Sequence, residues 1–140
     1  MTTETPVLRR IWLAVARTTT LFRLNTGMAW ASGGGKVVKR PNGDAIVPFG
    51  RPISLGFGKP DNTPLNGASD LVGWTTVEIN GTRVAIFTAI EVKRTTGGRR
   101  SPDQITFVDN VRAAGGIAGF ATSEEDAIGI IADYLAALRQ

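Results

Sequence analysis

The sequence contains no histidine and no cysteine among its 140 residues. Without histidine there is no imidazole general base, no Ser-His-Asp triad and no phosphohistidine chemistry. Without cysteine there are no disulfides, thiolate nucleophiles or zinc–thiolate sites. A metal site in this chain would be built from carboxylates, carbonyls and water, which favour magnesium, manganese or calcium.

Long apolar runs are missing as well. No stretch approaches the roughly 18 consecutive apolar residues of a membrane span, and the N-terminus lacks a charged-then-apolar signal pattern. We therefore expect a soluble, cytoplasmic protein that makes no membrane contact. With 140 residues, 42% of them hydrophobic, the chain has the usual size of one compact domain, residues 1–140.

Positive charge outweighs negative charge, and it is unevenly distributed. The formal net charge is +4, yet from Ser101 onward six acids stand against two bases. The positive excess therefore lies in the first hundred residues. It favours a polyanionic partner such as nucleic acid, although the basic surface of a soluble protein accounts for the same balance.

A β-hairpin over residues 70–93 is the clearest element. Two runs rich in Val, Ile, Thr, Phe and Trp flank Asn80-Gly81, a dipeptide that favours a two-residue type I′ turn. This turn places Ile79 opposite Thr82, and it thereby fixes which residues lie opposite each other along the rest of the two strands. One face of the hairpin then carries an apolar set typical of a core face: Leu71, Val77, Ile79, Val84, Ile86, Ile90 and Val92.

The other face of the hairpin ends in charged side chains. The register places Asp70 opposite Glu91, with Cβ atoms about 4.5–5.5 Å apart, and strand alternation puts Lys93 on the same face. Two carboxylates and a lysine are typical of phosphodiester hydrolysis, in which carboxylates hold a divalent ion and the lysine orients water or stabilises developing charge. A structural Asp–Lys–Glu salt network is the alternative.

Helical patterns precede and follow the hairpin. Residues 4–17 repeat apolar residues at helical spacing, with Glu4 at the helix start, where an acid also complements the helix dipole. Residues 101–104, Ser-Pro-Asp-Gln, are typical of a helix N-terminus with a capping box, and capping alone accounts for Gln104.

The end of the chain completes an alternating pattern. Residues 117–121 predict a short strand, and Ser123 begins a final helix. A strand on either side of the Ser101 helix predicts a βαβ crossover and therefore a mixed sheet. The buried face of the final helix is expected to consist of Ile128, Ile131, Ala132 and Leu135.

The remaining segments are basic. Residues 21–30 predict a short strand followed by a turn at Thr26-Gly27, and Arg23 and Asn25 either contact phosphate or form a solvated edge. Glycine and proline punctuate residues 31–66, which predict short strands and loops that serve as a basic flap over a substrate or as a dimer-forming element. The flexible loop after the hairpin offers three phosphate-contacting side chains: Arg94, Arg99 and Arg100.

Asp70, then Glu91-Val92-Lys93, then Gln104 at the start of a helix form a pattern that resembles the PD-(D/E)XK nuclease superfamily. Further residues are similar to its virus-type replication-repair (VRR-NUC) branch, although Ser69 stands where the family usually has proline. The resemblance implies an α/β, restriction-endonuclease-like fold, a mixed β-sheet with a central hairpin flanked by helices. The further matching residues are Glu4, Arg23, Asn25, Gly27, Gly67, Leu71, Ser101, Gly116 and Ser123 to Asp126.

The resemblance also implies roles for these residues. Asp70, Glu91 and the backbone carbonyl of Val92 would hold Mg²⁺ or Mn²⁺, with Lys93 as the catalytic lysine. Glu4 would join the metal site directly or through water. Gln104 would help to hold the site or the scissile phosphate.

The function implied is that of a divalent-metal-dependent DNA endonuclease without an organic cofactor. Small stand-alone members of this branch resemble phage-encoded homodimers that act on branched, Holliday-junction-like DNA, which implies a phage or bacterial origin. Two alternatives stay open: a non-catalytic DNA-binding module with the same fold, and a sequence-specific restriction-type endonuclease.

Overall fold

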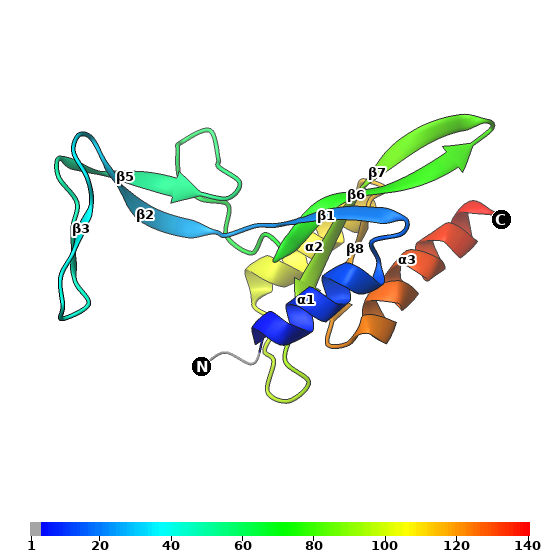
Figure 1. Ribbon diagram of the computed structural model, residues 1–140. Helices are drawn as coiled ribbons and strands as arrows, with labels where there is room; N and C mark the ends of the chain where they lie inside the picture. Colours follow the sequence, from blue (N-terminus) through cyan, green and yellow to red (C-terminus); the bar gives the residue numbers. More distant parts are fainter. Residues whose placement is uncertain (1–3) are drawn as a thin grey trace. The chain divides into compact units, whose positions relative to one another are not determined.

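The computed structural model describes residues 4–140, which form two compact units (Figure 1). The first unit combines the N-terminal part of the chain, up to Leu24, with everything from Gly67 onward. The second unit is Asn25–Asn66.

The first unit contains a four-stranded sheet in the order β1-β6-β7-β8. Strands β1 and β7 both run antiparallel to β6, whereas β8 runs parallel to β7. The predicted α/β class and mixed sheet are therefore confirmed. The elements are α1 (Glu4–Ala14), β1 (Thr19–Arg23), β6 (Leu71–Ile79), β7 (Thr82–Val92), α2 (Pro102–Ala113), β8 (Ile117–Ala121) and α3 (Glu124–Leu138).

The turn between β6 and β7 has the predicted geometry. Asn80 and Gly81 both adopt positive φ, 51° and 78°, as a type I′ turn requires. The register runs from Ile79 opposite Thr82 to Leu71 opposite Ile90, as predicted. One more step along both strands brings Asp70 beside Glu91.

The parallel pair β7–β8 is joined by α2, which makes the predicted crossover. Ser101 is the N-cap of α2, Pro102 follows it, and the capping box between Ser101 and Gln104 is complete. None of the helices among residues 4–140 has the length and apolarity needed to cross a membrane.

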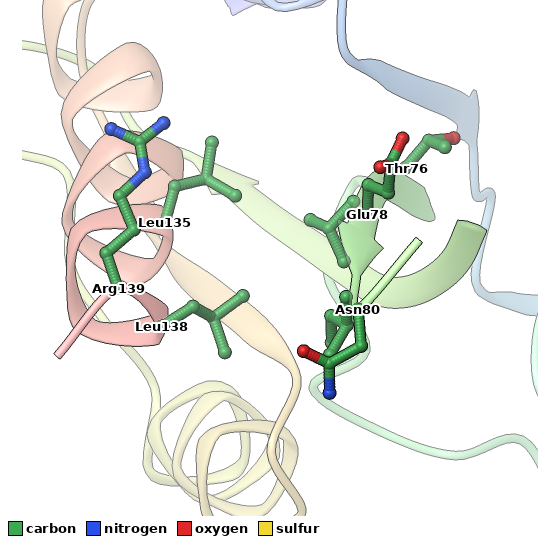
Figure 2. Close-up of a pocket in the computed structure, with 8 residues that line it drawn as sticks. Thr76, Glu78, Asn80, Leu135, Leu138 and Arg139 are labelled. Carbon is green, nitrogen blue, oxygen red and sulfur yellow. The ribbon is translucent and has the colours of Figure 1, made fainter. Parts of the chain in front are cut away.

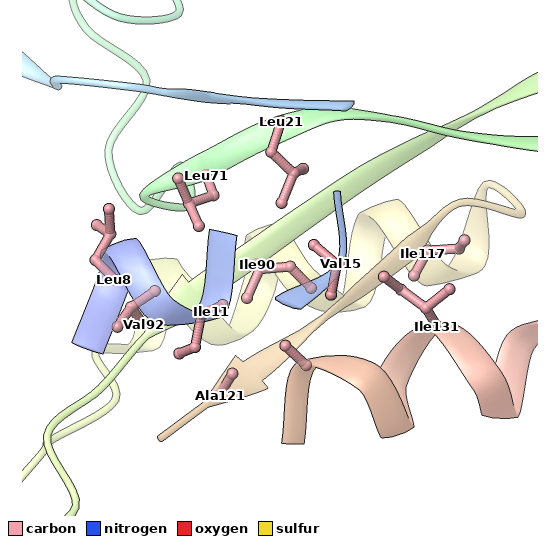
Figure 3. Close-up of a cluster of buried hydrophobic side chains, with 11 residues drawn as sticks. Leu8, Ile11, Val15, Leu21, Leu71, Ile90, Val92, Ile117, Ala121 and Ile131 are labelled. Atoms are coloured by element: carbon pink, nitrogen blue, oxygen red, sulfur yellow. The ribbon is translucent and has the colours of Figure 1, made fainter. Parts of the chain in front are cut away.

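The main hydrophobic core lies between one face of the sheet and helices α1 and α3 (Figure 3). Ile11 of α1, Leu71 of β6 and Ile90 of β7 are fully buried in it. Helix α2 packs on the other face, against β7 and β8, where it buries Val108. The remaining core residues are Leu8, Val15, Leu21, Val92, Ile117, Ala121, Ala127 and Ile131.

Two predicted element bounds are wrong. Helix α1 ends at Ala14 instead of residue 17, because the chain turns there and the Thr19 N–H reaches the Val15 carbonyl at 3.0 Å as β1 begins. The short strand predicted from residue 21 begins at Thr19 and ends at Arg23, and Gly27, predicted to lie in the turn after it, begins a strand of the second unit.

Three predicted core positions, Ile79, Ile128 and Ala132, are also exposed. Ile79 lies at the end of the hairpin, 40% exposed, and lines a groove of 490 Å³ with Leu135, Leu138 and Arg139 of α3 (Figure 2). Ile128 is 50% exposed because α3 turns a neighbouring stripe toward the sheet. That stripe consists of Ala127 and Ile131, with Ile130, Tyr134 and Leu135 partly buried, and Ala132 lies outside it.

The second unit consists of short antiparallel strand pairs, as the Gly/Pro-rich sequence predicts. Strand β2 (Gly27–Ser32) pairs with β5 (Gly50–Leu55), and β3 (Val38–Lys39) pairs with β4 (Ala45–Ile46). No residue of Asn25–Asn66 is buried. This unit therefore lacks a hydrophobic core of its own.

A chain of threonine hydroxyls crosses three strands on the core face. Thr75 Oγ1 lies 2.8 Å from Thr19 Oγ1 and 2.7 Å from Thr88 Oγ1, and Thr88 donates to the Ile86 carbonyl at 3.0 Å. Each hydroxyl has one proton to donate, and Thr88 uses its proton for the Ile86 carbonyl. The Thr75 hydroxyl must therefore donate to Thr88, and the Thr19 hydroxyl must donate to Thr75. All three threonines are buried.

We expect Thr75→Val to lower the free energy of unfolding by about 1–3 kcal/mol, because it leaves the buried Thr19 hydroxyl without an acceptor. The double variant Thr19→Val/Thr75→Val should recover part of this loss. Thr76→Val, at an exposed position on the opposite face, is the control and should change stability by about 0.5 kcal/mol or less. Urea denaturation measures all three; a Thr75→Val protein as stable as the wild type would contradict the assignment.

Candidate active site

The predicted carboxylate pair lies where β6 begins and β7 ends. Glu91 is 3% exposed, and Asp70 is half-buried beside it. The backbone N–H of Val92 donates to Asp70 Oδ2 at 2.9 Å. This hydrogen bond holds the Asp70 carboxylate against β7 and therefore close to Glu91.

A buried ion pair forms beside these carboxylates. Lys93 Nζ lies 3.1 Å from Glu91 Oε1, and both side chains are largely shielded from solvent. Gln104 bridges the pair, since its Nε2 donates to Glu91 Oε1 and its Oε1 accepts from Lys93 Nζ at 2.8 Å. The structure thus brings Asp70, Glu91, Lys93 and Gln104 together.

Gln104 contacts the site and caps its own helix at the same time. Its Oε1 also accepts from the Ser101 N–H at 3.0 Å, while its backbone N–H donates to Ser101 Oγ at 3.2 Å. The amide orientation follows from its partners, because only the oxygen can accept from an ammonium and only the nitrogen can donate to a carboxylate. The capping interpretation and the site interpretation of Gln104 are therefore compatible.

Gly67 brings the first turn of α2 up to the start of β6. Its φ is +81°, and a Cβ placed on it would overlap the carbonyl group of Asp103. Any larger residue would push α2 away and move Gln104 with it. The sequence marks Gly67 only as one residue of a pattern; its positive φ and close contact depend on the position of α2, which is distant in sequence.

Burial dominates the electrostatics of Glu91. Desolvation, followed by the nearby negative charge of Asp70, raises the pKa of Glu91 to about 7, although Lys93 acts in the opposite direction. The second oxygen, Glu91 Oε2, is buried and has no hydrogen-bond partner among the described residues. Lys93 and Gln104 therefore both contact Glu91 through Oε1.

These groups fit a hard divalent cation. The Asp70 and Glu91 carboxylates and the Val92 carbonyl offer oxygen ligands, and Glu91 Oε2 has unused acceptor capacity in a buried position. Mg²⁺ is typically bound by one or two carboxylates together with waters and substrate phosphates. Among the side chains that the structure describes, which exclude that of Glu4, no three acidic groups come together to form a larger cluster.

The predicted pattern also includes the positions of Glu4, Ser69, Arg23 and Asn25. Glu4 is the first residue of α1, but its side chain lies outside the described part of the structure. Ser69, at the family's proline position, is fully buried, and its hydroxyl finds no partner among the described residues. Arg23 ends β1 in the first unit, whereas Asn25 belongs to the second unit.

The predicted phosphate-binding arginines differ in their surroundings. The guanidinium of Arg100 lies 4.3 Å from the centre of the Phe120 ring. Phe120 is paired with Glu91 in the β7–β8 ladder and shares its face of the sheet. Arg100 is therefore held next to the carboxylates by a cation–π contact, whereas Arg94 and Arg99 lie on the exposed loop before it.

Comparison with known proteins finds a similarity that covers the site. Residues 63–125 match the family model of the VRR-NUC domain, and this stretch contains the hairpin, α2 and β8. No curated protein and no solved structure matches the chain. The mixed sheet with flanking helices is consistent with the PD-(D/E)XK superfamily. The stretch that matches the VRR-NUC domain includes Asp70, Glu91, Lys93 and Gln104.

Proposed function

We propose that residues 1–140 act as one divalent-metal-dependent DNA endonuclease domain. The observation that carries this proposal is the buried carboxylate of Glu91, paired with Lys93 on one oxygen and unpartnered among the described residues on the other. Asp70 lies beside it, and the whole group falls within the VRR-NUC match. A buried carboxylate arranged in this way is costly for stability, which favours a functional role.

Each residue has a role in phosphodiester hydrolysis. Asp70, Glu91 and the Val92 carbonyl would hold Mg²⁺ or Mn²⁺, with Glu4 as a further ligand, directly or through water. Such an ion lowers the pKa of bound water and polarises the phosphoryl oxygen. Lys93 orients the attacking water or stabilises negative charge that develops on the phosphate.

Two other groups position this machinery. Gln104 holds Lys93 and Glu91 in place through its amide, and α2 holds Gln104. Arg100, together with Arg94 and Arg99, would bind phosphates next to the cut. Arg23 and Asn25 are proposed as further DNA contacts.

Branched DNA and a homodimer are the finer parts of the proposal. The second unit buries none of its residues and exposes large apolar side chains, including Trp30 at 67% and Phe49 at 85%. A second copy of the chain would cover such a surface. Two active sites in one dimer would suit symmetric nicks across a Holliday-like junction, inside a phage-infected or bacterial cytoplasm.

We expect the wild-type protein to nick a labelled four-way junction in Mg²⁺ and to leave it intact in EDTA. Lys93→Met should reduce kcat by about 10²–10³-fold, since it removes the cation that stabilises the transition state, while DNA binding persists. Arg139→Met, at the C-cap of α3, is the control and should leave cleavage unchanged. Denaturing gels with junction and linear duplex measure cleavage.

Other outcomes of this experiment select the alternatives. Intact but bound DNA would favour the non-catalytic binding module. Cleavage of linear duplex at one short sequence would favour a restriction-type enzyme. Full activity in Lys93→Met would contradict the proposed active site.

We expect the affinity for Mn²⁺ to rise as the pH increases from 6 to 8. With a pKa of about 7, the Glu91 carboxyl is mostly protonated at pH 6 and mostly ionised at pH 8, so protons compete with the cation at the lower pH. Titration calorimetry in buffers of different ionisation enthalpy measures affinity and proton release together. Glu91→Gln should bind weakly at both pH values. An affinity that does not change over this range would contradict the assignment of Glu91 as a ligand.

We expect light scattering to give about twice the chain mass of 14.9 kDa. The double variant Trp30→Ser/Phe49→Ser should shift the protein toward the monomer, because it removes exposed apolar contacts of the second unit. Leu13→Ser is the control, since Leu13 is 65% exposed on α1 in the first unit. A monomeric wild-type protein would exclude the dimer.

A further inference from the structure

Three aromatic side chains form a row across β1, β6 and β7. Phe22, Trp74 and Phe87 are 53%, 40% and 41% exposed. The rings of Phe22 and Trp74 are 5.7 Å apart at an interplanar angle of 47°. Trp74 is paired with Phe87 in the β6–β7 register, so the three side chains form one continuous strip.

This aromatic strip shares a face of the sheet with the carboxylate pair. Side chains alternate along a strand, so Trp74 points to the same side as Asp70, and Phe87 to the same side as Glu91. The core face is the opposite one. At roughly 3.3 Å per residue, Trp74 lies about 13 Å along β6 from Asp70.

The strip is open to solvent among the described residues of the first unit. Helix α2, which packs on this face, makes its main contacts with β7 and β8, and the face is covered at Val72 and Ala89, between the strip and the carboxylates. The exposed fractions of the three rings agree with this arrangement. Solvent-exposed aromatic rings in a continuous row are typical of a binding surface.

The surroundings of the strip favour nucleobases as its ligand. At the site end, the same face carries Lys93 and Arg100, the latter held over Phe120. Cations at this end suit the phosphates of a strand, and aromatic rings further along suit its bases. Stacking on aromatic side chains requires bases that are not enclosed in a duplex, and it tolerates any base sequence.

We propose that Phe22, Trp74 and Phe87 form a stacking surface for unpaired nucleobases close to the scissile phosphate. The inference rests on the proposed nuclease function and refines its substrate class. The favoured DNA has an unpaired or splayed segment within a few nucleotides of the cut. Selectivity for structure then arises from the sheet face itself.

The test is binding by the full-length protein in EDTA, measured by fluorescence anisotropy. The probes are a labelled oligothymidylate and an abasic oligonucleotide of the same length and phosphate number. We expect the wild type to bind the oligothymidylate about tenfold more tightly than the abasic strand. Trp74→Ala should lose most of this ratio, and Trp74→Phe should retain most of it. Leu13→Ala, on α1 over the opposite face, should leave the ratio unchanged.

A second measurement uses the wild-type chain only. Photocrosslinking of DNA that carries 5-iodouracil, followed by mass spectrometry, should label Phe22, Trp74 or Phe87. Equal affinity for the two probes, or crosslinks confined to other residues, would overturn the proposal. A halved molar mass in Trp74→Ala would also overturn it, because the strip would then be an interface between two copies.

Binding in EDTA separates this proposal from the proposed enzymatic activity. Base-dependent binding without cleavage in Mg²⁺ would support the stacking surface and reject the nuclease function. Cleavage without base-dependent binding would support the nuclease function and reject the stacking surface.

Discussion

The register of the β6–β7 hairpin puts Asp70, Glu91 and Lys93 on one face of the sheet. Asn80 and Gly81 form a two-residue turn with positive φ at both positions, and this turn permits one pairing of the strands. A slip of one residue would move Glu91 to the core face and Ile90 to the α2 face. A turn about 33 Å of strand away from Glu91 therefore determines which carboxylates meet.

The site that this register builds is costly to bury. Glu91 is removed from water next to a second carboxylate, and its raised pKa reflects that cost. Lys93 and Gln104 compensate only one of its oxygens. A buried pair of this kind adds little to stability compared with apolar residues of similar size. Its arrangement fits the proposed binding of a divalent cation.

Because side chains alternate along a strand, the two faces of the sheet have different roles. One face packs against α1 and α3 and stabilises the fold with buried residues such as Leu71 and Ile90. The other face carries the carboxylates at one end and the exposed ring of Trp74 further along. Since both faces come from the same strands, the apolar packing of one fixes the functional groups on the other.

The sequence by itself determined the parts that depend on near neighbours. The Asn80-Gly81 turn, the capping box of α2 and the convergence of Asp70, Glu91 and Lys93 follow from turn geometry, helix capping and strand alternation. Only the tertiary structure decided how the elements cover one another. The exposure of Ile79, Ile128 and Trp74, and the division of the chain after Leu24, depend on which distant segments pack together. The burial of Glu91 and the contact of Gly67 with α2 have the same origin, because desolvation and steric fit act between groups far apart in sequence.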